Sequence, residues 1–403
     1  MPVAVLGGGL QGCCVAIELA MRGIRVTLFE GNSTLLAGAA TANEGKIHLG
    51  YTYASDRSLT TARTLLRGAL SFGPLVQRYL DSDVPLAASE PFVYAVHRDS
   101  QVKVEDFATY LDATHSLVAA AAGRDSYFGI DLKPAPKRLT QAELESRFDP
   151  AYVTAAFDTS EIAIDTVAMA MSIRRRIAEE SRIEVRTGRK ITAVENNGTR
   201  LRVHSTGIDS DDADSDTFSS VVNALWDGRL AIDATRGVYP GRKWIHRFKH
   251  GIRFRLIDTA TLSSVTIVLG PFGDLVAYGD GSYYLSWYPA CMTDHSVALA
   301  PPAWRAEPDD PCRSRIVTTS FAAMGSIVPK LARVRPQNIA VKGGVIVAWG
   351  STDIDDHASE LHRRYEIGVH SYGSYHSIDS GKLTMAPHFA KICADRIPLK
   401  SAP

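Results

Sequence analysis

The chain has 403 residues, and its 44 lysines and arginines are balanced by 44 aspartates and glutamates. A net charge of zero provides no field that would attract nucleic acid or a membrane surface, so a small-molecule partner is expected. A single hydrophobic core stops growing at ~250 to 300 residues, so a chain of this length predicts two domains.

The five cysteines form no Cys-x-x-Cys pair and show no regular spacing. This pattern argues against a zinc site or a disulfide framework, so we expect no metal centre and a cytoplasmic protein. No apolar run approaches the ~18 residues of a membrane span. We interpret the apolar start as a strand and not as a leader peptide.

A glycine-rich turn follows the first predicted strand, residues 3–6, in the order Gly7-Gly8-Gly9-Leu10-Gln11-Gly12. In a dinucleotide-binding turn the first glycine lets the chain leave the strand sharply, and the second lets a pyrophosphate approach the backbone. The third lets the next helix pack closely on the strand. Gly7, Gly9 and Gly12 occupy these three positions.

The segments after the turn complete a strand–helix–strand unit. Residues 10–22 predict a helix that begins with Leu10 and Gln11, and its unpaired N–H groups would face the phosphates. Residues 25–29 predict a second strand that ends at Glu30 and Gly31, about twenty residues on, where a carboxylate meets ribose hydroxyls. The unit predicts a Rossmann-type nucleotide-binding domain.

The rest of the first half combines a glycine-rich loop with helices and short strands. We interpret residues 35–53 as a functional loop, because the segment is too irregular for a helix. Asp165 is the expected N-cap of a helix over residues 166–180. Further helices are predicted over residues 60–80 and 102–122, strands over 183–186, 190–195 and 201–204, and a solvated hairpin tip over 209–216.

The second half contains an insertion rich in strands. Residues 220–224 predict a buried strand that returns to the first sheet, whereas residues 240–295 predict a second, sheet-based domain. A buried strand at residues 345–349 and a helix at 385–397 close the chain. We assign residues 1–80, 150–240 and 340–403 to the nucleotide domain, and residues 81–149 and 241–339 to the substrate domain.

Two further segments carry a resemblance to a known family. Residues 40–50, ATANEGKIHLG, and residues 380–387, SGKLTMAP, together with residues 7–30, resemble the FAD-dependent D-amino acid oxidase-like superfamily. That superfamily includes glycine and sarcosine oxidases and the glycerophosphate and L-2-hydroxyglutarate oxidases. The resemblance implies an α/β fold, with a glutathione-reductase-like FAD-binding domain and an inserted antiparallel β-sheet substrate domain. It also implies FAD as the cofactor.

The resemblance assigns cofactor contacts to both segments. In the family the first loop lies against the flavin and the last turn stabilises charge on its pyrimidine ring, with weaker support from the strand that contains Ile191. We expect Cys291 and Cys393 to give no covalent anchor, so the FAD is non-covalent. Leu225-Trp226-Asp227-Gly228 departs from the family pattern of a glycine and then an aromatic, which puts the local flavin contacts in question. The implied contacts are Thr41, Asn43, Gly45, Lys46, Ile47, Ser380, Gly381, Lys382, Leu383 and Thr384.

His48 is the candidate catalytic residue, because the family's histidine at this position faces the substrate. Oxidation of an alcohol requires a base for the hydroxyl proton, and a neutral imidazole suits that task. The alternative is a packed loop histidine that bonds only to the backbone.

The substrate residues are the least determined part of the site. Substrates of the superfamily commonly carry an anion, which an arginine fork holds well. We expect Arg253, Tyr51 and Tyr288 to bind the substrate, with solvated or core positions as the alternative.

Four functions remain open from the sequence. The first is hydride removal from an amine-bearing carbon to flavin N5, placed slightly ahead because the superfamily leans toward amines. The second is oxidation of a 2-hydroxyacid or glycerophosphate-like alcohol, with His48 as base. A flavin monooxygenase is the third, although Asp379-Ser380-Gly381 does not match its usual Gly-Asp-Ala. The fourth is a non-catalytic nucleotide-binding protein. An oxidase would pass electrons to O2, and a dehydrogenase to another acceptor.

Overall fold

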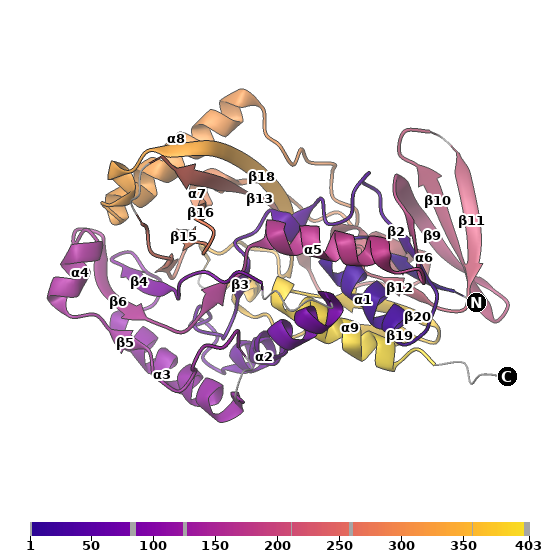
Figure 1. Cartoon of the computed structure of the whole chain (residues 1–403), viewed down its shortest axis with the longest axis horizontal. Coiled ribbons are helices and arrows are strands. Elements are labelled where there is room, and N and C mark those ends of the chain that lie inside the picture. Colours follow the sequence, from indigo (N-terminus) through magenta and orange to yellow (C-terminus); the bar gives the residue numbers. More distant parts are fainter. Residues whose placement is uncertain are drawn as a thin grey trace.

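A computed structural model describes residues 2–80, 86–123, 127–210, 212–257, 261–356 and 358–398. The chain has an α/β architecture, with a mostly parallel sheet in one half and a mostly antiparallel sheet in the other (Figure 1). This arrangement confirms the expected fold class.

The first half is built on a six-stranded sheet with strand order β19-β20-β12-β1-β2-β8. Neighbouring strands pair in parallel except at the edge, where β19 is antiparallel to β20. The expected return of the chain at residues 220–224 is confirmed, because β12 pairs with β1. The strands are β1 Val3–Leu6, β2 Val26–Phe29, β8 Ile183–Arg186, β12 Val221–Asn223, β19 Gly368–Tyr372 and β20 Tyr375–Asp379.

Helices cover this sheet. Helix α1 (Leu10–Met21) packs against α9 (Ala386–Asp395), and α5 (Thr166–Glu179) lies beside α1 (Figure 1). The side chain of Asp165 accepts the N–H groups of Val167 and Ala168, so it caps α5 as the sequence predicts. Helix α2 covers Thr60–Leu80, the bounds that the sequence predicts.

The second half is built on a nine-stranded sheet in the order β17-β13-β16-β15-β14-β4-β6-β5, with β18 also paired to β13. Helix α8 (Asp310–Ile327) covers it through Ile316 and Met324 (Figure 1). The strands are β4 Val93–His97, β5 Lys137–Arg138, β6 Val153–Asp158, β13 Trp244–Leu256, β14 Val265–Val268, β15 Gly273–Ala277, β16 Ser282–Trp287, β17 Met292–Ser296 and β18 Pro336–Trp349.

Two strands of this sheet do not follow the boundaries expected at residues 150 and 340: β6 lies just after residue 150, and β18 crosses residue 340. Strand β6 pairs with β4, and β18 pairs with β13 along most of its length. Both strands therefore belong to the large sheet, although most of their residues fall within ranges that we assigned to the nucleotide domain. The remaining helices are α3 Val104–Ala121, α4 Gln141–Arg147, α6 Arg229–Thr235 and α7 Tyr288–Cys291.

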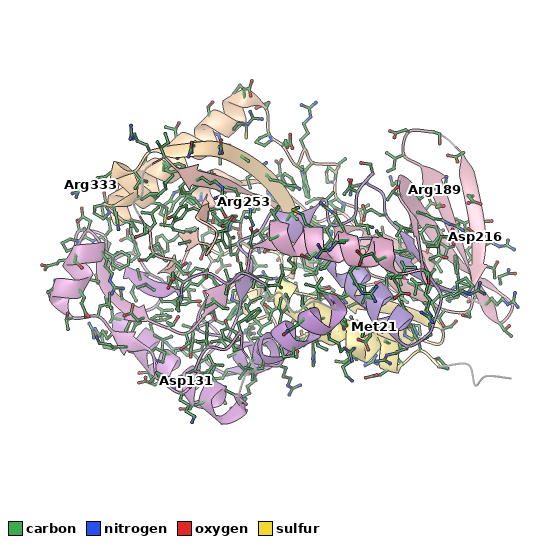
Figure 2. All side chains as sticks on the ribbon, in the orientation of Figure 1. Met21, Asp131, Arg189, Asp216, Arg253 and Arg333 are labelled. Atoms are coloured by element: carbon green, nitrogen blue, oxygen red, sulfur yellow. The ribbon has the colours of Figure 1, made fainter. Side chains whose placement is uncertain are left out.

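A three-stranded sheet of β9 (Arg189–Asn197), β10 (Arg200–Gly207) and β11 (Ala213–Phe218) projects from the first half (Figure 1). Residues 213–216 belong to β11, so the hairpin tip is shorter than we expected; residue 211 lies outside the described residues. Acidic side chains are tolerated in β11 because arginines face them. Arg186 pairs with Asp216 of β11, and Arg189 pairs with Asp214 of β11 and with Asp212 directly before the strand; Figure 2 labels Arg189 and Asp216.

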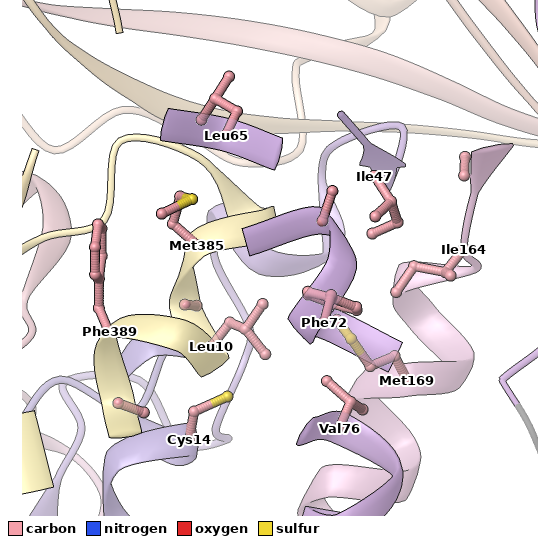
Figure 3. Close-up of a cluster of buried hydrophobic side chains, with 14 of the residues drawn as sticks. Leu10, Cys14, Ile47, Leu65, Phe72, Val76, Ile164, Met169, Met385 and Phe389 are labelled. Atoms are coloured by element: carbon pink, nitrogen blue, oxygen red, sulfur yellow. The ribbon is translucent and has the colours of Figure 1, made fainter. Parts of the chain in front are cut away.

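A hydrophobic core joins the elements that follow the glycine turn, the loop at residues 35–53 and the C-terminal turn (Figure 3). The loop contains the short strand β3 (Lys46–Ile47), which pairs with β7 (Ile162–Ala163). Because one core receives side chains from all of these elements, none of the three segments can shift independently. The contributing side chains include Leu10, Cys14, Ile47, Leu65, Phe72, Val76, Ile164, Met169, Met385 and Phe389.

The glycines of the first turn have distinct physical roles. Gly7 has a φ of +97°, which L side chains rarely adopt. A Cβ at Gly12 would lie 1.8 Å from the carbonyl oxygen of Gly7, so α1 can approach β1 only without a side chain there. A Cβ at Gly9 would meet nothing within 4 Å, which leaves open space before the first turn of α1.

We predict that Gly12→Ala lowers the free energy of unfolding by about 3 kcal/mol, the upper end for overpacking, because the obstructing atom is backbone. Urea unfolding of the cofactor-free protein measures the change. Gly9→Ala is the matched control and should alter the unfolding free energy by less than about 1 kcal/mol. Equal stability of the two variants would contradict the assigned role of Gly12.

Candidate functional site

The carboxylate of Glu30 lies beside the glycine turn. Its Oε2 accepts the N–H of Gly8 at 2.8 Å, and its Oε1 accepts the N–H of Asn32 at 2.8 Å. The second strand therefore delivers an acid to the turn, where the sequence places the ribose, and Gly31 is the next residue in the chain.

Hydrogen bonds connect the glycine turn to the C-terminal turn. The side chain of Gln11 donates from Nε2 to the carbonyl oxygen of Ala386 at 3.0 Å and accepts at Oε1 the hydroxyl of Ser380 at 2.8 Å. Gln11 is 6% exposed, so water does not compete for these bonds. One buried side chain thus joins two segments that are more than 360 residues apart in sequence.

The C-terminal turn also contacts the loop at residues 35–53. The hydroxyl of Thr384 donates to the carbonyl oxygen of Lys46 at 3.3 Å, and the N–H of His48 lies 3.5 Å from the same hydroxyl. Leu383 begins the short helical turn that carries Thr384. The structure therefore brings together all three segments that the resemblance identifies.

Internal bonds fix the backbone of the loop. The side chain of Asn43 accepts the N–H of Gly45 at 2.8 Å and donates to the carbonyl oxygen of Ala39 at 2.8 Å. Gly45 has a φ of +75°, and a Cβ there would lie 2.1 Å from a backbone oxygen. Thr41 accepts a hydrogen bond of 2.9 Å from Lys342 of β18, which brings a cation to the loop.

The other cofactor candidates lie near this junction or beneath it. Gly381 has a φ of +59°, and its N–H donates to Asp379 at 3.2 Å. Ile191 is buried in a core that it shares with strands β1 and β2. The indole of Trp226 donates to the carbonyl oxygen of Val345 at 2.8 Å, so the bulk that departs from the family pattern is directed onto β18.

A cavity of about 220 Å³ lies between the junction and the large sheet. It receives side chains from both halves of the chain, which is a common position for small-molecule sites. Its lining includes Ala42, Asn43, Glu44, Lys46, His48, Tyr53, Arg247, Lys249, Asp274, Tyr284, Tyr288, Leu361, Arg364 and Lys382.

His48 lines this cavity, with Glu161 behind its ring. The Nδ1 of His48 lies 3.5 Å from Oε1 of Glu161, at the long limit of hydrogen-bond distance, and has no other partner among the described residues. The ring of Tyr53 packs edge-on against the imidazole at 5.5 Å between centroids. This arrangement leaves Nε2 available to a molecule in the cavity.

Glu161 is fully buried and firmly held. Its Oε2 accepts the N–H of Leu49 at 2.6 Å, and its Oε1 accepts the hydroxyl of Tyr94. Burial raises the pKa of Glu161, but its bonds to His48 and Tyr94 and the charge of Lys46 outweigh burial and hold the pKa below its usual range. Burial lowers the pKa of His48, and Glu161 only partly opposes that effect. The pair is therefore a carboxylate beside a neutral imidazole.

Sequence reasoning missed Glu161. Strands β3 and β7 pair so that Ile47 lies opposite Ile162, which places His48 next to Glu161 in the continued register. The two residues are more than 110 positions apart, and two-residue strands have no usable periodicity. An acidic residue directly before the apolar run Ile162-Ala163-Ile164 was the only local signal.

The carboxylates on the cavity wall are matched by lysines. Lys46 binds Asp274 at 2.7 Å and lies 4.3 Å from the centroid of the Phe92 ring. Burial lowers the pKa of Lys249, but Glu44 and Asp274 outweigh it and raise the pKa overall. Burial raises the pKa of Glu44, but Lys249 and Lys46 outweigh it and lower the pKa overall. These shifts keep Glu44, Asp274 and Lys249 in their charged forms at neutral pH.

The structure separates the three expected substrate residues. Tyr288 lines the cavity and accepts at its hydroxyl a 2.6 Å hydrogen bond from Arg247. Tyr51 is buried beneath the site, 3.3 Å from the ring of His115. Arg253 is not among the lining residues, because it binds Asp165 at 3.0 Å and Thr166 at 2.8 Å near the start of α5 (Figure 2).

Arg247 is the arginine of strand β13 that reaches the cavity. It bonds both Tyr288 and Asp353, the latter at 2.8 Å. Its exposed fraction is only 3%, so its charge is held out of bulk water. Sequence reasoning selected Arg253 from this strand, which covers Trp244–Leu256, and missed Arg247 six residues earlier.

Comparison with known protein families identifies the chain. Residues 2–396 match the family described as "FAD dependent oxidoreductase", DAO. The chain belongs to this family. It is an FAD-dependent oxidoreductase, as the resemblance in the sequence implied.

Solved structures of several flavoproteins share the fold. Glycine oxidase from Geobacillus kaustophilus has a TM-score of 0.67 at 15% identity and covers 98% of this chain and 93% of its own. L-alpha-glycerophosphate oxidase from Mycoplasma pneumoniae has a TM-score of 0.65 at 16% identity, and the match covers 100% of this chain and 96% of the oxidase. NikD, an amino acid oxidase of nikkomycin biosynthesis, has a TM-score of 0.67 at 16% identity, and the match covers 98% of this chain and 92% of NikD.

A curated protein, the FAD-dependent monooxygenase FPY4 of Fusarium mangiferae, is 32% identical over 109 residues. The match spans 27% of this chain and 27% of the fungal protein.

In the described part of the chain, no helix has the length and hydropathy needed to cross a membrane.

The residues at the junction fit FAD. Gly9 leaves open space before the uncapped N-terminus of α1, which suits a pyrophosphate. The carboxylate of Glu30 lies at the glycine turn, and Asn43 and Lys382 line the cavity. The individual contacts of these residues with FAD stay predictions.

We predict that Gln11→Leu weakens FAD binding by ~10- to 100-fold, because the Ser380 hydroxyl and the Ala386 carbonyl lose a buried partner. Fluorescence titration of the cofactor-free protein with FAD measures the dissociation constant. Gln141→Leu, on the exposed face of α4, is the control and should bind FAD like the parent. Unchanged affinity in Gln11→Leu would show that the junction does not depend on this bridge.

Proposed function

We propose that this protein oxidises a hydroxyl-bearing carbon beside an anionic group and produces a carbonyl. The observation that carries the proposal is the pairing of His48 with Glu161 at the wall of the cavity. A base is needed when the reacting group is a hydroxyl, whereas an amine reacts once it is bound in its neutral form.

The residues of the chain perform the proton part of this reaction. His48 has a lowered pKa, so its neutral ring accepts the hydroxyl proton at Nε2 as the C–H bond breaks. The positive charge that forms on the ring lies beside the Glu161 carboxylate, which stabilises it. Bound FAD supplies the acceptor for the hydride and its two electrons.

Arg247 and Tyr288 are the proposed clamp for an anionic group next to the reacting carbon. The guanidinium of Arg247 supplies the hydrogen-bond donors for the carboxylate. The Tyr288 hydroxyl accepts from Nη1 of Arg247 at 2.6 Å and donates to Asp353 at 2.6 Å, and the same Nη1 donates to Asp353 at 2.8 Å, so Tyr288 and Asp353 fix the position of the guanidinium. This clamp takes the role that we expected for Arg253.

Oxidation of an amine is the second candidate, and the names of the structural neighbours glycine oxidase and NikD favour it. The cavity offers it less support, because Asp274 and Glu44, the carboxylates among the described lining residues, are matched by lysines. O2 or another acceptor would reoxidise the flavin. The free cysteines support a cytoplasmic location.

Anaerobic mixing of the FAD-loaded protein with matched substrate pairs tests the proposal. Each pair has the same carbon skeleton and carries either a hydroxyl or an amine, such as lactate with alanine and glycolate with glycine. We expect bleaching of the flavin by a hydroxyl compound. Bleaching by the amines alone would overturn the proposal in favour of the second candidate.

We predict that His48→Gln slows flavin reduction by about 100-fold or more, within the range for loss of a general base, and leaves FAD bound. Stopped-flow absorbance measures the rate at saturating substrate. His204→Gln, on the exposed hairpin of β10, serves as the matched control and should reduce at the parental rate. A His48→Gln variant that reduces normally would remove this residue from the mechanism.

The rate of flavin reduction should depend on pH through His48. Because burial lowers its pKa below the usual value of about 6.5, the rate should be constant above neutral pH and fall in more acidic solution as the ring becomes protonated. Glu161→Gln should lower the plateau by ~10- to 100-fold and move the inflection to lower pH, because the carboxylate raises the pKa of His48. An inflection that does not move would exclude coupling between the two residues.

A further inference from the structure

The charges that line the cavity do not cancel. Among the described lining residues, five lysines and arginines face two carboxylates. Lys46 pairs with Asp274 at 2.7 Å, and Arg247 pairs with Asp353 at 2.8 Å. Lys249 is matched by Glu44, which raises its pKa. Two lining cations remain without an acidic partner.

The first of these cations is Lys382, in the C-terminal turn. Its Nζ forms no hydrogen bond or ion pair with a described residue, and it lies 5.8 Å from the centroid of the Tyr53 ring. Burial and the nearby Arg364 lower the pKa of Lys382 to about 7. Glu44 opposes these effects only in part, so no carboxylate of the described residues balances the charge of the lysine.

The second is Arg364, which is 8% exposed. Its Nε donates to the carbonyl oxygen of Leu361 at 3.1 Å, and its Nη1 to that of Val347 at 3.2 Å. These neutral acceptors fix the guanidinium without cancelling its charge, and Nη2 has no partner among the described residues. The nearby carboxylate of Asp379 is already bound by Arg229 at 3.3 Å.

The unmatched pair has an electrostatic consequence. Two cations held close together out of bulk water repel each other, and burial and Arg247 lower the pKa of Arg364 to about 10. An anion between them would form charge-assisted hydrogen bonds with both and remove this repulsion. An anion of two charges would complete the charge balance of the wall.

We infer that Arg364 and Lys382 form a second anion subsite in the cavity, which binds a dianionic part of the substrate. The substrate class is thereby narrowed to hydroxy compounds with a phosphate monoester or additional carboxylates. This inference rests on the proposed function for the identity of the reacting group. The subsite itself requires only that the anion binds.

Unreactive anions test the subsite without turnover. The probes are methyl phosphate, malonate and acetate at constant ionic strength, titrated into the FAD-loaded protein while the visible flavin spectrum and the melting temperature are recorded. We expect methyl phosphate or malonate to bind at least ~10-fold more tightly than acetate, because each carries two charges. Tighter methyl phosphate indicates a phosphate ester, and tighter malonate indicates two carboxylates.

Substitutions locate the binding. Lys382→Met and Arg364→Gln should each weaken dianion binding by about 10- to 100-fold, the range for loss of a charged hydrogen bond. The controls are Lys391→Met on α9 and Arg255→Gln on β13, both of which bear exposed side chains outside the cavity lining. If Arg364→Gln does not fold, Lys382→Met decides the question alone.

The result that overturns the subsite is equal binding of acetate and the dianions, or full dianion affinity in Lys382→Met. His48→Gln separates the subsite from the proposed reaction, because this variant should keep dianion affinity while its flavin reduction is slow. A protein that oxidises simple hydroxyacids but binds no dianion would refute the subsite alone. A protein that binds dianions but oxidises only amines would refute the proposed reaction alone.

Discussion

The site depends on the buried hydrogen bonds that join the two ends of the chain. Gln11 connects the glycine turn to Ser380 and Ala386, and Thr384 connects the same C-terminal turn to the backbone of Lys46. FAD is an extended molecule, so its nucleotide and flavin ends must be received by segments that lie far apart in sequence. A single shared core then keeps those segments in register (Figure 3).

The cavity lies where this junction meets the large sheet, and its chemistry follows from that position. His48 comes from the loop, and Glu161 directly precedes the strand paired with that loop. Arg247 comes from β13 and Tyr288 from α7. Burial makes each charge sensitive to its partners, since water cannot screen it. A neutral imidazole, a clamped arginine and two unmatched cations can therefore coexist within one small volume, each with a separate role.

Local rules explain what the sequence could predict. The glycine turn, the Asp165 cap and helix α2 depend on residues a few positions apart, and the structure has each of them where the pattern indicated. The pairing of β12 with β1 followed from the buried strand predicted at residues 220–224. These features required no knowledge of distant contacts.

The missed features depend on pairing over long distances. Glu161 reaches His48 only through the two-residue strands β3 and β7, and Arg364 reaches Lys382 only because both line the same cavity. Arg253 carried the right chemistry in the right strand, but Asp165 and Thr166 bind its guanidinium, and Arg247, six residues earlier, enters the cavity. Residue type and strand periodicity cannot distinguish those two arginines.

A crystal structure of the protein with FAD bound tests the central claim most directly. The account predicts that the flavin ring contacts both the loop that carries Asn43 and the turn that carries Lys382, with Nε2 of His48 facing the cavity in front of the ring. It also predicts that the pyrophosphate lies at Gly9 and the start of α1. A flavin ring that contacts only one of the two segments, or a His48 side chain turned away from the cavity, would contradict it.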